Sequence, residues 1–193
     1  MPKIIKNLHD QITAACLDLF CRHSYESVEM KMIARDCGVA VGTLYNYYDS
    51  KWDIFFEVLN HFWTGIIATL DEINRLSLDD GEKLSRAIEY LDGSLISHSA
   101  LSVVFFDPRG LTDDHQSEIN LLYKEVIQAL ESLLEPFGDG SDPKPGHLKN
   151  RLAEHILLAV TYFPRNGVTE PGRAETMAAA MIQLLSDPGV KSK

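Results

Sequence analysis

Residues 38–51, with the sequence GVAVGTLYNYYDSK, constrain the fold of this chain more than any other stretch. Gly38 can take the positive φ that ends one helix and lets the backbone fold back into the next. In the short helix expected there, Val39, Leu44 and Tyr48 fall on one side and can anchor it to a small core. The opposite side is slim and polar, and it carries mainly Gly42, Thr43 and Asn46. A helix that packs on a core through one face and carries small side chains on the other suits insertion into the major groove of DNA.

The rest of the chain has a helical pattern. Apolar residues recur at intervals of three and four, and no strand-like alternation, internal repeat or low-complexity tract is visible, which predicts an all-α protein. Ser50 can cap a long fourth helix, with Asp53 favouring its N-terminus and apolar residues continuing to Leu70. The other expected helices cover residues 4–22, 28–37, 82–98, 100–106, 113–135, 147–163 and 171–186, of which 100–106 is the least regular.

These elements divide the chain into two domains. The first, residues 1–51, ends at the start of the fourth helix, and the second covers residues 52–193. The net charge of −10 lies wholly in the second, because residues 1–51 hold six basic and six acidic side chains while the remainder holds 12 and 22. An acidic body would repel DNA everywhere except through the neutral head, which predicts modest non-specific affinity and a shallow salt dependence.

Several classes of protein are disfavoured by what the sequence lacks. No apolar run approaches the ~18 residues of a membrane span, and the N-terminus lacks a signal-peptide core, so we expect a cytoplasmic protein without a membrane partner. Gly-rich phosphate loops, G-x-S-x-G, H-E-x-x-H and Glu-x-x-His pairs are all missing, so we expect no enzyme, cofactor or metal. Cys16, Cys21 and Cys37 show no C-x-x-C spacing and are expected to be reduced core residues.

The N-terminal residues resemble the TetR family of bacterial one-component transcriptional regulators over roughly residues 8–59. In the first two helices and the turn after them, the matching residues are Ile12, Ala15, Leu19, Phe20, Ile33, Ala34, Gly38 and Val39. In the short helix that suits the major groove, called the reading helix below, and at the entry to the fourth helix, they are Gly42, Thr43, Leu44, Tyr45, Tyr47, Tyr48, Ser50 and Lys51. Beyond residue 60, only the length and the all-helical pattern are similar to the family.

The resemblance implies a nine-helix TetR-like homodimer. Two helix-turn-helix heads would read the half-sites of a palindromic operator, and the helical bodies would bind a small effector that releases the DNA. The residues implied to face bases are Val41, Gly42, Thr43 and Asn46. Tyr45, Tyr47 and Lys51 are implied to contact phosphates or brace the helix, and Lys31 to reach the flanking DNA backbone.

The chemistry of the reading residues agrees with these roles. Asn46 suits bidentate pairing with adenine, and Thr43 suits a thymine methyl group or a phosphate, although a merely solvated helix face is the alternative. Tyr47 and Tyr48 cannot both be buried, and we expect Tyr48 in the core and Tyr47 at phosphate. Lys51 is unfavourable at a helix start, and a phosphate partner explains it better than a role in stability.

Two residues depart from the family pattern. Glu29 stands where the family usually has a Thr that caps the second helix and contacts phosphate, and Ala40 stands where it often has Ser. Ala40 cannot cap, at a cost of ~1 kcal/mol, and Glu29 would repel phosphate. Ser27 is a possible substitute cap for the second helix. Both changes indicate weaker or narrower DNA binding.

The body offers less specific candidates. The last helix carries small apolar residues nearly all round, so residues 147–163 and 171–186 are expected to form a homodimer interface, with closure of the chain's own core as the alternative. The effector residues are expected among aromatic and apolar side chains that are otherwise plain core: Phe62, Trp63, Ile66, Tyr90, Phe105, Phe106, Tyr123, Tyr162 and Phe163. Polar contacts could come from His98, His115 and His155.

Three functions stay open at this point. The first is a ligand-responsive regulator, most simply a repressor released by its effector. The second is a helical DNA-binding protein without an effector, and the third is an interaction module whose head no longer binds DNA.

Overall fold

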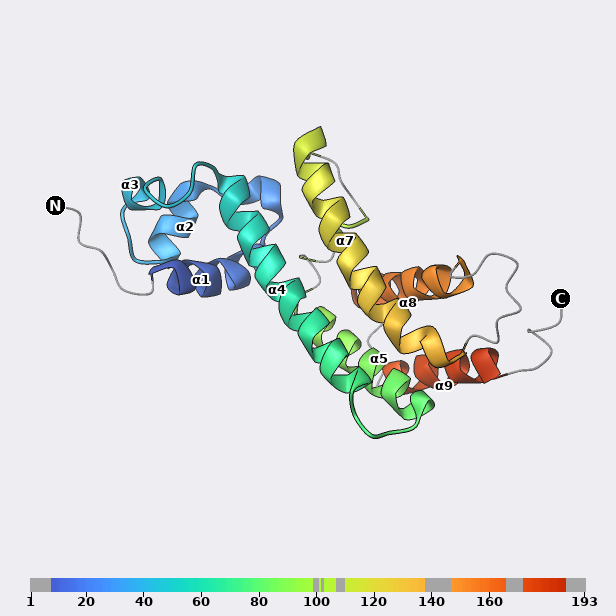
Figure 1. The fold of residues 1–193 in the computed structure, drawn as a ribbon. Helices are drawn as coiled ribbons and strands as arrows, with labels where there is room; N and C mark the ends of the chain where they lie inside the picture. Colours follow the sequence, from blue (N-terminus) through green and yellow to red (C-terminus); the bar gives the residue numbers. More distant parts are fainter. Residues whose placement is uncertain are drawn as a thin grey trace.

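The computed structural model describes residues 8–98, 101, 103–106, 110–137, 147–165 and 172–186 (Figure 1). Within these ranges the chain forms α-helices, short 3₁₀ helices and turns and no β-strand, which confirms the all-α prediction. Part of the helix expected at 100–106 lies outside the described residues. The elements are α1 (Leu8–Arg22), η1 (Tyr25–Ser27), α2 (Met30–Asp36), α3 (Val41–Leu44), α4 (Lys51–Asn74), α5 (Asp80–Ser97), α7 (Asp113–Leu134), η2 (Glu135–Phe137), α8 (His147–Arg165) and α9 (Arg173–Ser186).

The head, residues 8–50, is a small bundle of α1, η1, α2 and α3. Its core contains side chains that are at most 3% exposed: Ile12, Cys16, Leu19, Phe20, Val28, Ile33, Ala34 and Leu44. Gly38 has φ of +66°, so it makes the left-handed turn between α2 and α3 that was expected of it. Val39 follows directly, and its amide donates to the carbonyl of Ala34 over 2.9 Å. The three cysteines are free, and all pack in or against this core, as predicted.

Helix α4 connects the head to the rest of the molecule (Figure 1). Its start is fixed by a reciprocal capping box, because the amide of Asp53 donates to Ser50 Oγ while the amide of Ser50 donates to the Asp53 carboxylate. The apolar face of α4 is buried along its whole length, and the helix packs on α1, α5 and α7. The cap at Ser50 and the broad apolar face were both predicted.

The body consists of α5, α7, α8 and α9. Helix α5 packs on α8 and α9, and α7 packs on α4 and α8. Asp92 of α5 forms an ion pair with Arg173 at the start of α9, and both side chains are largely buried. Helix α9 therefore covers the core of its own chain, with Ala178 buried, while Ala179 and Ala180 are exposed. No helix among the described residues is long and apolar enough to cross a membrane.

Candidate DNA-reading head

The short helix expected to read DNA is α3, which is a single turn. It begins after Ala40 and ends at Leu44, and the amides of Tyr47 and Tyr48 both bond the carbonyl of Leu44 in the turn that follows. Leu44 is fully buried, and Tyr48 is 6% exposed. These two side chains hold the segment from behind, as the sequence predicted.

The outer surface of this segment presents most of the expected reading residues. Gly42 and Asn46 are exposed, and Thr43 is half-buried. A β-carbon added at Gly42 would meet nothing within 4 Å, so the backbone here is open to a partner. Tyr45 and Tyr47 are 53% and 44% exposed, so two large side chains project into solvent just after α3. This arrangement can place one amide group against base edges and two phenols at its margin.

The remaining candidates take less direct positions. Val41 is half-buried and packs against the core. Lys31 is exposed on α2. Tyr48, the more buried of the neighbouring pair, lies in the core while Tyr47 lies outside it, which confirms the assignment of Tyr48 to the core.

The two departures from the family pattern leave both helix starts without side-chain caps. Glu29 occupies the N-cap position of α2, and Ala40 occupies that of α3, and neither makes a capping hydrogen bond. The expectation that Ser27 substitutes as a cap is wrong, because Ser27 lies in η1 and its hydroxyl donates to the carbonyl of Ser24. Glu29 is exposed at the start of α2.

Lys51 is engaged within the head. Its Nζ donates to the carbonyls of Tyr25 and Val28 over 2.7 and 2.9 Å and lies 4.2 Å from the centre of the Tyr25 ring. Burial lowers the pKa of this ammonium, and the carboxylates of Glu26 and Glu29 act in the opposite direction. Lys51 was expected either to contact phosphate or to brace the helix, and these bonds correspond to bracing.

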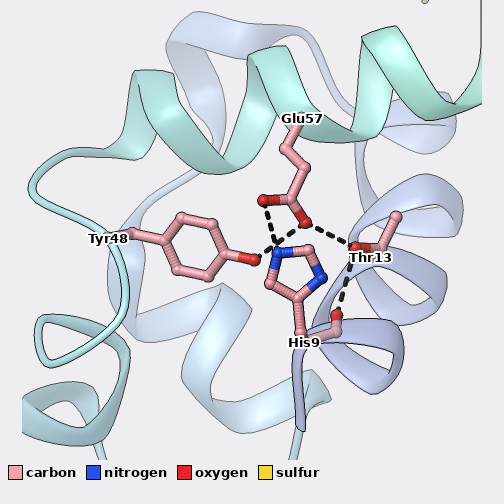
Figure 2. Close-up of polar contacts among 4 residues, drawn as sticks. All are labelled: His9, Thr13, Tyr48 and Glu57. Atoms are coloured by element: carbon pink, nitrogen blue, oxygen red, sulfur yellow. Dashed lines mark hydrogen bonds and ion pairs between the residues drawn. The ribbon is translucent and has the colours of Figure 1, made fainter. Parts of the chain in front are cut away.

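A polar cluster that sequence reasoning missed joins α1, α4 and the turn after α3 (Figure 2). Glu57 Oε1 accepts a hydrogen bond from the Tyr48 hydroxyl over 2.9 Å, and Oε2 lies 2.9 Å from His9 Nε2. The Thr13 hydroxyl lies 2.9 Å from Glu57 Oε1 and 3.1 Å from the carbonyl of His9. Burial, followed by the bond to Glu57, raises the pKa of Tyr48. The sequence signal for this cluster was Glu57, an acidic residue among the apolar residues Ile54, Phe55 and Val58 of α4.

Several of the expected effector residues, on α4, on α7 and in the segment between α5 and α7, form a partly connected aromatic cluster. Ring contacts run from Phe62 to Trp63, from Trp63 to Phe105 at 4.9 Å, and from Phe105 to Tyr123 at 5.5 Å. Phe106 also contacts Tyr123, and His98 contacts Phe62. We call Phe62, Trp63, His98, Phe105, Phe106 and Tyr123 the aromatic cluster.

The other body candidates lie elsewhere. Ile66 is buried on α4, and Tyr90 is half-buried on α5. His115 contacts Trp52 rather than the aromatic cluster, and His155 is exposed. The side chains of Tyr162 and Phe163 are outside the described residues.

Two features near the aromatic cluster bear on ligand binding. Trp63 is fully buried, and its Nε1 has no hydrogen-bond partner within the described part of the chain. An unsatisfied buried donor costs about 1–3 kcal/mol, which a ligand with an acceptor would recover. A groove of about 400 Å³ between α7 and α8 is lined by Asn120, Tyr123, Lys124, Ile127, Gln128, Glu131, Asn150 and Glu154. Tyr123 belongs to both the groove and the aromatic cluster.

Comparisons with known proteins agree with this architecture. Residues 12–58 match the family described as "Bacterial regulatory proteins, tetR family". A fatty acid metabolism regulator protein of Bacillus subtilis (strain 168) is 25% identical over 149 residues, which are 77% of this chain and 76% of that protein.

Solved structures extend the similarity to the whole fold. The transcriptional regulator FadR from Bacillus subtilis, in complex with stearoyl-CoA, has a TM-score of 0.73 at 22% identity, covering 92% of this chain and 97% of that one. AibR, in complex with isovaleryl coenzyme A and operator DNA, has a TM-score of 0.68 at 16% identity, with coverage of 92% and 97%. The family match over residues 12–58, together with the short exposed α3, the long α4 and the helical body, supports a regulator of the TetR family.

Proposed function

We propose that this protein is a homodimeric transcriptional repressor that binds a palindromic operator through its two heads and is released by a small-molecule effector. The observation that carries the proposal is the outer face of α3 and the turn after it. There Gly42 and Asn46 are exposed, with Tyr45 and Tyr47 beside them, on a segment fixed by the buried Leu44. In this arrangement Asn46 and Thr43 contact bases, and Tyr45, Tyr47 and Lys31 contact phosphates.

Dimerisation follows from how little DNA one head can read. A single-turn reading helix reaches only a few base pairs, so useful specificity needs two half-sites about one helical turn apart or a multiple of that spacing. The outer faces of α8 and α9 are the proposed interface. Leu158 on α8 is 43% exposed, and Ala179 and Ala180 leave room for close approach on α9.

Acyl-CoA thioesters are the effector class that we propose. Two structural neighbours are described in complex with such molecules, stearoyl-CoA and isovaleryl coenzyme A. The aromatic cluster supplies apolar contacts of the kind an acyl chain needs, and Trp63 Nε1 supplies a buried donor for a carbonyl oxygen. The body carries net negative charge, which does not favour binding of the coenzyme A phosphates. We therefore assign only the acyl part to the aromatic cluster.

Selection of bound sequences from a random DNA pool, at moderate salt and with purified protein, tests the DNA-binding role. We expect a palindromic consensus in which Asn46→Ala loses the preference at one position of each half-site. Asn60→Ala, which removes an exposed amide from α4, should keep the whole consensus. No enrichment by a folded dimer would contradict the proposal and favour a body that acts as an interaction module.

The effector role is tested with the selected operator. Fluorescence anisotropy of labelled operator is measured while acyl-CoA thioesters of increasing chain length are titrated. Release of DNA by one range of chain lengths, with no release by free coenzyme A, is the expected result. Binding of operator that no thioester changes would favour a DNA-binding protein without this class of effector.

A further inference from the structure

Trp52, in the first turn of α4, is bonded to the start of α7. The indole is 5% exposed, and its Nε1 donates to Glu118 Oε2 over 2.6 Å. Its ring stacks on the imidazole of His115, with centroids 3.8 Å apart and planes 10° from parallel. Both partners lie in the first two turns of α7, so the N-terminus of a body helix is fastened to the entry of α4.

The same indole also touches the head. Trp52 meets the ring of Tyr25, which belongs to η1, edge to face at 5.8 Å. Tyr25 in turn lies under the ammonium of Lys51, which also bonds its carbonyl. Three rings therefore connect body to head in the order His115, Trp52, Tyr25.

A second contact between body and head lies just before α7. Gly110 has φ of +83°, and a β-carbon placed there would lie 3.3 Å from Oε1 of Glu26 in η1. A side chain at this position would be strained and would press on Glu26. The chain leading into α7 thus runs close to η1, the short helix that Trp52 also contacts.

These contacts link the start of α7 to the head without running along the length of α4. A head attached through α4 alone could tilt about its first turn, whereas a second attachment at α7 fixes its orientation. The attachment uses a directional bond from an indole, which is only a donor, to one carboxylate, and not apolar packing alone. A movement of the start of α7 would therefore act on Trp52 and, through its ring contact with Tyr25, on η1.

We propose that the Trp52–His115–Glu118 joint is the coupling element of this protein: His115 and Glu118 are positioning residues through which the body sets the orientation of the reading head. The inference rests on the proposed function, since it concerns how effector occupancy and operator affinity are linked. A ligand changes operator affinity only if it favours one of two arrangements of the joint.

The test compares coupling in variants that leave the reading surface and the aromatic cluster intact. Operator dissociation constants are measured with and without saturating stearoyl-CoA for wild type, Glu118→Ala, His115→Ala and the double variant. Glu125→Ala, an exposed carboxylate on the same helix, is the matched control. Coupling factors of 5–150-fold are typical, and we expect the double variant to lose at least about fivefold of the wild-type factor. A double variant that folds and keeps the full factor would overturn the proposal.

A second measurement separates this inference from the proposed effector class. The chain has two tryptophans, so protein labelled with 5-fluorotryptophan gives two fluorine resonances, and a Trp52→Phe variant identifies the one from Trp52. We expect this resonance to shift when operator is added, even if stearoyl-CoA releases no DNA. A response to operator without a response to stearoyl-CoA would reject the effector class while supporting the joint. A Trp52 resonance that neither molecule moves would show that the joint is structural only.

Discussion

The hydroxyl of Tyr48 donates a 2.9 Å hydrogen bond to the carboxylate of Glu57, which lies nine residues further along the chain (Figure 2). Tyr48 ends the turn after the reading helix, and Glu57 lies on α4 and also meets Thr13 and His9 of α1. One carboxylate therefore sets the distance between three segments of the head. The position of α3 depends on this cluster as well as on the buried Leu44.

Replacing Tyr48 by Phe removes that bond while keeping the ring. We expect a loss of about 1.5–3 kcal/mol in the free energy of unfolding, the usual range for a hydrogen bond to a charged group. Urea denaturation measures it. Tyr47→Phe, in an exposed phenol, is the control and should change stability little. Equal effects of the two variants would show that Glu57 does not hold the turn.

Loss of Asn46 should alter specificity more than stability. Because a bidentate contact to adenine is worth about 1–3 kcal/mol of discrimination, Asn46→Ala should relax the preference at one position of each half-site. Competition binding with operators changed at single base pairs measures this preference. Affinity that falls equally for all sequences would indicate a phosphate contact instead.

Lys51→Met distinguishes bracing from phosphate contact. The variant leaves the carbonyls of Tyr25 and Val28 without their donor, so operator affinity should fall through displacement of the head. The slope of log affinity against log salt concentration should stay as in wild type. A phosphate contact would instead reduce the slope by about 0.9. Lys31→Met is the comparison expected to show that reduction.

The pH dependence of stability should reflect the thiols of the head. Burial, followed by the charge of Asp18, raises the pKa of Cys21 from 9.0 to about 11. Burial also raises the pKa of Cys16 and is assisted by its neighbour Cys37. Because the folded thiols hold their protons where unfolded thiols have lost them, the thiol contribution to stability should be constant below pH 9 and should fall from pH 9 towards 11.

Urea midpoints measured from pH 7.5 to 10.5 test this dependence. A Cys21→Ala variant should lose part of the fall above pH 9, whatever its stability at neutral pH. An unchanged slope would show that other groups cause the fall.

Trp63 should distinguish carbonyl-containing effectors from hydrocarbons. Trp63→Phe removes the buried donor and keeps an aromatic ring, so acyl-CoA affinity should fall by about 1–3 kcal/mol. Isothermal titration calorimetry measures the loss, with Tyr90→Phe as the control outside the aromatic cluster. An unchanged affinity would place the carbonyl elsewhere.

Local sequence signals were enough for the elements of the head. Gly38 at φ of +66°, the capping box of Ser50 and Asp53, and the burial of Leu44 and Tyr48 are all short-range consequences of residue type and spacing. The helix boundaries of the body agree to within a few residues for the same reason.

Contacts between distant segments could not be read from the sequence. The Glu57 cluster joins residues up to 48 positions apart, and the bond from Trp52 to Glu118 spans 66. Periodicity places each of these side chains on its own helix but does not say which helices meet. The same limit explains why Lys51 was expected at phosphate. Its two carbonyl partners precede it by more than 20 residues, so the sequence alone did not indicate these contacts.

The length of α4 gives small angles a large effect. Its 24 residues make a rod about 36 Å long at 1.5 Å per residue. If the body end is the pivot, a tilt of only 5° carries the other end through roughly 3 Å, by the geometry of a rod of that length. Successive base pairs of DNA are about 3.4 Å apart, so that displacement equals about one step of the double helix. The helix acts as a lever. In the homodimer proposed above, a rearrangement too slight to disturb the core at one end would be enough to take the two heads out of register with a palindrome.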